Sequence, residues 1–148
     1  MIPRGSEGIA NLATRVGLHL IPSAPDAYTA ADLGMMTMLL GLVAQDYDRA
    51  ADVLVGERAA LEPLFRKAAT RLPTLAARIG EALGAEAPSL KVHDLTARSD
   101  IDLKLLIDIQ AAVEGATGAD AEWATALDAE IWGFLEAHVA ARAYEAAF

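Results

Sequence analysis

The strongest pattern in the sequence is a regular spacing of apolar residues between positions 33 and 54. Steps of three and four residues alternate along this stretch, which places the side chains along one side of an α-helix. The residues at these steps are Leu33, Met36, Leu40, Val43, Tyr47, Ala50 and Leu54. From Leu33 to Ala44 the helix carries no charged side chain on any side. The pattern therefore predicts that neighbouring helices or a second molecule cover this stretch.

The same register continues and predicts one long helix over residues 30–72. Thr29 and Asp32 have the spacing of a capping box at its start. A straight helix of this length would extend roughly 65 Å at about 1.5 Å per residue. Pro63 removes one backbone hydrogen bond, and Gly56 adds a weak point before it. We therefore expect the helix to kink or break between Gly56 and Pro63.

Composition predicts an all-α protein. The chain has 148 residues, of which 33 are alanine, and no segment alternates apolar and polar residues as an exposed strand does. The length corresponds to a single domain, residues 1–148. Helix signals also occur over 7–18, 73–83, 100–115 and 121–146, with a surface connection over 85–98. Short connections between the helices favour an up-and-down bundle of four to six helices.

Charge and segment length limit the partners and the compartment. The chain has 12 basic and 21 acidic residues, a net charge of -9, which argues against binding to nucleic acid or to anionic lipid. The longest uncharged stretch, Leu33 to Gln45, has 13 residues, whereas a membrane-spanning helix needs about 20. No targeting segment is evident, so we expect a cytoplasmic protein with no membrane contact. Residues 1–6 contain Pro-Arg-Gly-Ser, which fits a protease-cleavage scar and native sequence equally well, so the sequence alone assigns these residues no role.

Recognisable catalytic and cofactor motifs are missing from the sequence. A di-iron bundle needs Glu-x-x-His on two helices, and the chain contains no such motif. Glycine-rich phosphate loops and the Gly-x-Ser-x-Gly nucleophile turn are also missing, and there is no cysteine to bind metal or attack a substrate. The sequence thus favours a non-enzymatic protein with no metal and no cofactor.

Two polar residues on apolar helix faces are the best candidates for a binding site. Asp108 lies between two isoleucines, and His138 lies on the apolar face of the last helix. Asp108 either faces the one exposed edge of its helix or forms a buried pair with His138 or Arg142. His138 is either a hydrogen-bonded core histidine or a residue that lines a cavity and binds a ligand or transfers a proton.

Three functional hypotheses follow. The first is a helical interaction or scaffold module that binds a second copy of itself, or another protein, through Leu33, Met36, Leu40, Val43 and Tyr47. Within this stretch Gly34 and Gly41 are spaced to admit a closely packed helix. The second is a bundle whose cavity binds a small apolar or acyl ligand, with Asp108, His138, Arg142 and Met36 at the site. Its other lining residues would be Leu40, Leu105, Ile109 and Phe134. The third is an enzyme that uses Asp108, Glu114 and His138.

Overall fold

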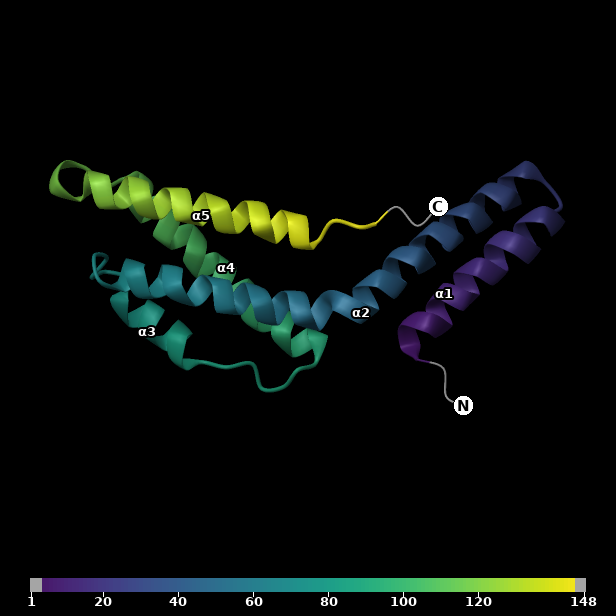
Figure 1. Ribbon diagram of the computed structural model, residues 1–148, viewed down its shortest axis with the longest axis horizontal. Helices are drawn as coiled ribbons and strands as arrows, with labels where there is room; N and C mark the ends of the chain where they lie inside the picture. The colour runs from purple at the N-terminus through teal and green to yellow at the C-terminus, as the bar shows by residue number, and fades with distance from the viewer. Residues whose placement is uncertain (1–3, 146–148) are drawn as a thin grey trace. The chain divides into compact units, whose positions relative to one another are not determined.

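The structure, a computed structural model, describes residues 4–145, and within this range it contains helices but no strand (Figure 1). This confirms the all-α prediction. The α-helices are α1 (Gly5–Arg15), α2 (Ala27–Ala69), α3 (Ala76–Gly84), α4 (Val92–Glu114) and α5 (Ala121–Ala141). The described residues divide into two compact units: unit 1 is 4–50 with 144–145, and unit 2 is 51–143. The single domain expected from the sequence stays a prediction.

Unit 1 is a helical hairpin made by α1 and the first half of α2 (Figure 1). After α1 the chain continues through a π-helical turn, Val16–Leu20, and a 3-10 turn, Ile21–Ser23. Gly17, in the π-helical turn, lies beside α2, where an added Cβ would make an ordinary contact of 3.5 Å with Cγ2 of Thr37. Among the described residues of unit 1, only Ala13 is buried. The hairpin therefore has almost no core of its own.

A side-chain cap at Asp26 starts α2. The backbone N–H of Thr29 donates a hydrogen bond to Oδ1 of Asp26 at 2.8 Å, and the Thr29 hydroxyl donates to Oδ2 at 3.0 Å. Mainly because of the backbone hydrogen bond, the pKa of Asp26 lies below its ordinary value of 3.8. The predicted capping box is therefore wrong: the cap precedes Thr29, and the helix begins at Ala27.

Unit 2 is the bundle of the molecule. It contains the second half of α2 together with α3, α4 and α5, and successive helices reverse direction as an up-and-down bundle requires (Figure 1). One face of each helix supplies the core, at steps of three and four residues. The largest fully buried apolar residues are Leu61, Phe65, Ile79, Ile109 and Ile131. Burying each of these side chains contributes about 1.5–3 kcal/mol.

Helix α2 continues through Pro63 without interruption. Pro63 and Ala59 both lie on the exposed side of the helix, so water can reach the Ala59 carbonyl that has lost its N–H donor. On the opposite side the core residues Leu61 and Phe65 are fully buried, which favours continued helix. We expected either a break or a kink between Gly56 and Pro63. The break does not occur, and the kink stays a prediction.

Several helix ends differ from the predicted ones, most of all the start of α4. Helix α4 begins at Val92, eight residues before the expected start at residue 100, because Ser89 and Asp94 organise an earlier first turn. Oγ of Ser89 accepts a hydrogen bond from the Lys91 N–H at 3.1 Å, and the hydroxyl donates to Asp94 at 2.6 Å. Helix α3 begins at Ala76, after turns that contain residue 73, and α5 ends at Ala141. The predicted end of that last helix, residue 146, lies outside the described residues, as do residues 1–3 of the segment set aside above.

Candidate functional site

The residues predicted as an interface form an exposed row on α2, here called the apolar stripe: Leu33, Met36, Leu40, Val43 and Tyr47. Met36, Val43 and Tyr47 are 54%, 51% and 65% exposed, and the other two are partly exposed. Helix α1 packs against a different side of α2, on small residues that include Thr37 and Ala44. The hairpin itself therefore leaves Met36 and Val43 exposed, although the first residue of α1, Gly5, contacts the Tyr47 ring.

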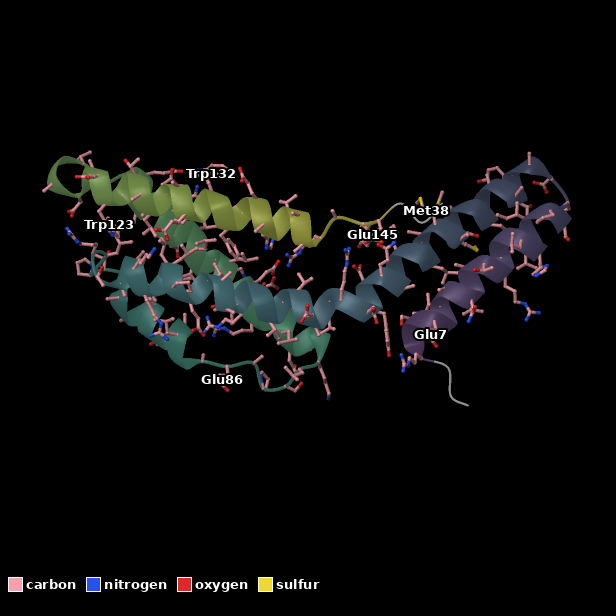
Figure 2. The ribbon with its side chains drawn as sticks, in the orientation of Figure 1. Glu7, Met38, Glu86, Trp123, Trp132 and Glu145 are labelled. Atoms are coloured by element: carbon pink, nitrogen blue, oxygen red, sulfur yellow. The ribbon has the colours of Figure 1, made fainter. Side chains whose placement is uncertain are left out.

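Other apolar side chains are exposed elsewhere on unit 1, and some of them lie on other sides of α2 than the stripe. Met38 projects outward from α2 (Figure 2) and is 44% exposed. Large exposed apolar side chains also include Leu12, Leu18, Leu20, Tyr28, Met35 and Leu39. Large exposed apolar surfaces are common at sites of contact with a protein, a ligand or a membrane. Within the described residues, α2 is also the one helix that is long and apolar enough to cross a membrane, and 6% of its most apolar stretch is buried.

A groove of about 680 Å³ runs between α1 and α2. Its walls carry mostly small side chains, such as Ala10 and Ala13 on α1 and Gly41 and Ala44 on α2. Gly41 lines this groove, and its role in close helix packing stays a prediction. Gly34 does not share this role, because a Cβ added there would meet nothing within 4 Å.

Both ends of the described chain contact the same turn of α2 in unit 1. The amide of Gln45 exchanges two hydrogen bonds with the backbone of Glu145, at 3.0 and 3.1 Å. The Tyr144 hydroxyl donates to Oδ2 of Asp46 at 2.7 Å, and this hydrogen bond raises the pKa of Tyr144 above its ordinary value of 10.0. At the other end Gly5 packs so closely on the Tyr47 ring that a Cβ would collide with it. These contacts fasten the two ends beside the last residue of the apolar stripe.

In unit 2, His138 and Arg142 form a cluster around the buried carboxylate of Glu57. Oε1 of Glu57 lies 2.9 Å from Nδ1 of His138, and Oε2 accepts a hydrogen bond from Nη2 of Arg142 at 2.8 Å. Glu57 is 7% exposed, and burial lowers the pKa of Arg142. The histidine is therefore partnered, as expected for a core histidine. Glu57 was missed, although it occupies the one step of the long apolar register that has no apolar residue.

A second buried cluster joins α2 and α4 through Asp102, which is fully buried. Arg98 donates to it from Nε at 3.0 Å and also from Nη2, and Nη1 of Arg58 donates to both oxygens at 3.3 Å. Both arginines also donate to the carbonyl oxygen of Ala82, at 2.7 and 3.1 Å. Asp102 was missed as well. The sequence does contain a sign that Asp102 is buried. It lies seven residues, or about two helical turns, from both Leu95 and Ile109, which are buried on the same face of α4.

Asp108 does not join His138 or Arg142. Its carboxylate is 46% exposed and binds Nη2 of Arg78 at 2.7 Å. The predicted buried pair is therefore wrong, and the alternative, that Asp108 faces the exposed edge of α4, is confirmed. The edge is exposed because α4 directs Leu105, Leu106 and Ile109 into the core.

The predicted ligand cavity, with Asp108 and His138 as its polar pair, does not form, because Asp108 is exposed and paired with Arg78. Leu105, Ile109 and Phe134 pack into the core of unit 2, whereas Met36 is exposed in unit 1. Glu114, the remaining candidate, lies on the surface of α4 and accepts a hydrogen bond from Gln110 at 3.3 Å. Within residues 4–145, no three His, Asp or Glu side chains are grouped to hold a metal ion.

Comparisons with protein-family models, curated proteins and solved structures find no match to this chain.

Proposed function

We propose that this protein is a non-enzymatic, cytoplasmic interaction module that forms a homodimer through the apolar stripe of α2. The exposure of Met36, Val43 and Tyr47 carries this proposal. Their row is spaced like the contact line between two helices, and about half or more of each of these side chains is exposed, although α1 touches the Tyr47 ring through Gly5. Covering this surface removes apolar area from water, at about 25 cal/mol per Å².

A second copy is the occupant that the stripe fits best. A two-fold interface brings the same patch of both copies together, so the patch must be complementary to itself. An uncharged apolar row meets this condition, because no like charges face each other when two such rows pack. From Leu33 to Ala44, α2 carries no charge.

A membrane is a weaker candidate for the same surface. Although α2 is long and apolar enough to cross a membrane, its uncharged stretch has 13 residues, fewer than the roughly 20 apolar residues of a typical span. A net charge of -9 also opposes binding to anionic lipid. These two quantities favour a protein partner in the cytoplasm.

The mass in solution tests the proposal. We expect light scattering across a concentration series to give twice the chain mass of 15.6 kDa. Val43→Glu and Met36→Glu should shift the protein to the monomer and leave the helical circular dichroism unchanged. Val139→Glu is the matched control, because Val139 is an exposed apolar residue on α5 in unit 2.

Three results would overturn the homodimer. The first is a monomer at every concentration, and the second is dissociation by Val139→Glu as complete as that by Val43→Glu. The third is sedimentation of the wild type with phosphatidylcholine vesicles that Val43→Glu abolishes, which would assign the stripe to a lipid surface instead.

A further inference from the structure

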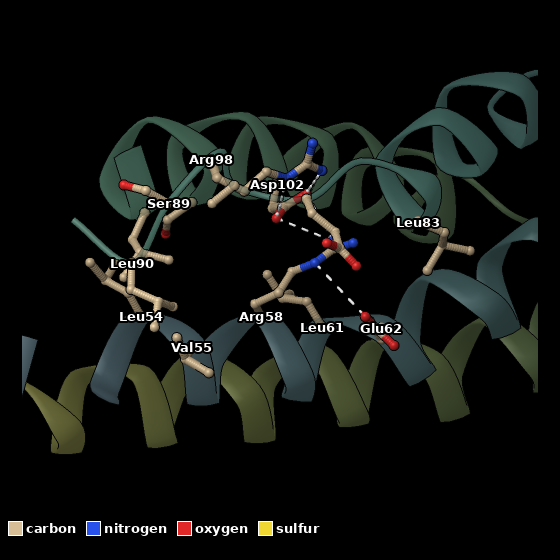
Figure 3. Close-up of a pocket in the computed structure, with 14 residues that line it drawn as sticks. Leu54, Val55, Arg58, Leu61, Glu62, Leu83, Ser89, Leu90, Arg98 and Asp102 are labelled. Atoms are coloured by element: carbon tan, nitrogen blue, oxygen red, sulfur yellow. Dashed lines mark hydrogen bonds and ion pairs between the residues drawn. The ribbon is translucent and has the colours of Figure 1, made fainter. Parts of the chain in front are cut away.

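A pocket of about 320 Å³ lies within unit 2, between the second half of α2, the end of α3, the connection over 85–91 and the start of α4 (Figure 3). Leucines supply much of its apolar lining: Leu54, Leu61, Leu83, Leu90 and Leu95. The Asp102 cluster supplies the polar part, with Arg58 and Arg98 beside the apolar walls. The pocket therefore combines an apolar lining with guanidinium groups at one place.

The polar part has more N–H donors than the protein supplies with hydrogen-bond acceptors, although Arg58 is also ion-paired with Glu62 at the pocket. Two guanidinium groups share one fully buried carboxylate, Asp102. Nη1 of Arg98 has no hydrogen-bond acceptor among the described residues. Nε of Arg58 has none either, since the nearest carboxylate, Glu62, is 3.9 Å away. A partly buried cation with free N–H groups favours an anionic acceptor.

We propose that this pocket binds a small amphipathic carboxylate, with its apolar tail against the leucines and its carboxylate on Arg58 and Arg98. One carboxylate offers acceptors to the N–H groups of the two arginines that make no hydrogen bond within the described residues. Glu62 and Glu86 at the pocket disfavour an anion with several charges, such as a phosphate ester. The proposal goes beyond the homodimer and does not depend on it, since the pocket lies wholly in unit 2.

The pocket is held open by contacts that need no ligand. Ser89 fixes the connection over 85–91 through its hydrogen bonds with Asp94 and Lys91. The carbonyl of Ala82 accepts from both arginines and so fixes them to the end of α3. A site with its walls and donors already in place loses little entropy when a ligand binds.

Decanoate is the probe for this site, and decan-1-ol, which has a similar chain but no charge, is its control. We expect calorimetry to show one decanoate per chain, bound about tenfold tighter than decanol, the difference typical of hydrogen bonds to a charged group. Amide and methyl NMR shifts should change at Leu54, Leu90 and Leu95. Equal affinity for the two probes, or no binding of decanoate, would overturn the proposal.

Two variants locate the bound probe. Arg98→Gln should weaken decanoate about tenfold and leave decanol unchanged. Because Arg98 also holds Asp102, Ala87→Trp provides a second test: it fills the pocket from the irregular connection and should abolish binding. Ala129→Trp, on the exposed side of α5, is its control and should bind as the wild type does. If Ala87→Trp binds decanoate normally, the ligand lies elsewhere and the pocket is not its site.

Discussion

Oε1 of Glu57 lies 2.9 Å from Nδ1 of His138, which joins the middle of α2 to the last turns of α5. The same carboxylate is held by Arg142, one helical turn further along α5. Glu57 is buried while its two partners are partly exposed. The cluster is thus a polar link at the edge of the core, and its effect on stability can be separated from that of the core itself.

Glu57→Ala should lower the free energy of unfolding by about 1–2 kcal/mol. The loss is moderate because His138 and Arg142 can turn to water when the carboxylate is removed. Urea unfolding followed by circular dichroism measures it. Glu130→Ala is the control: Glu130 pairs with Lys67 on the surface, and its removal should cost less than about 1 kcal/mol. Equal losses in the two variants would show that burial of Glu57 adds nothing.

Asp102→Asn and Asp108→Asn make a matched pair of substitutions on α4. The first leaves Arg58 and Arg98 without their buried counter-charge and should cost about 3 kcal/mol. The second removes an exposed pair with Arg78 and should cost less than about 1 kcal/mol. Chemical denaturation of both variants measures the difference. An Asp102→Asn protein as stable as Asp108→Asn would contradict the role assigned to the Asp102 cluster.

The cap of α2 should weaken in acid. The pKa of Asp26 is lower in the folded chain than its ordinary value of 3.8, so the cap is fully present above 3.8 and is lost as pH falls through the folded pKa. The Thr29 amide, followed by NMR, should titrate with a midpoint below 3.8. Asp26→Ser keeps an acceptor for Thr29 but cannot titrate there, so the transition should disappear. A midpoint at or above 3.8 would contradict this prediction.

The contact of Tyr144 with α2 should weaken in base. Its hydrogen bond to Asp46 raises the pKa of Tyr144 above 10.0, so the contact is present below 10.0 and is lost as pH rises through the raised pKa. Phenolate absorbance of the wild type minus that of Tyr144→Phe isolates this titration, whose midpoint should exceed 10.0. The Glu145 amide signal should shift over the same range. A midpoint at or below 10.0 would show that the hydrogen bond does not persist in solution.

Apolar spacing was enough to predict the helices and the residues that face the core. The steps that place Leu127, Ile131 and Phe134 on one side of α5 are the steps at which they are buried. The same spacing identified the stripe from Leu33 to Tyr47, but it did not decide whether α1 would cover it. That depended on small residues elsewhere on α2, which direct α1 to a different side.

The buried charges could not be predicted in the same way. Glu57 and Asp102 lie at positions where the helical register calls for an apolar residue, and each is buried only because arginines on its own or another helix reach it. Asp108 looked more buried than Asp102 because isoleucines flank it along the chain. Neighbours in sequence point to different sides of a helix, so they do not report on burial. The partners of a buried charge come from elements whose arrangement is known only after folding.

The contacts of Gly5 and Glu145 with one turn of α2 have a practical consequence. A reporter or affinity tag attached just before Gly5 or just after Glu145 would begin close to the turn of α2 that carries Tyr47. Its bulk would hinder self-association through the apolar stripe even when the fold is unchanged. The exposed turn at Gly118, between α4 and α5, offers a better insertion point. Solution measurements on this protein should therefore be made with both ends free of added sequence.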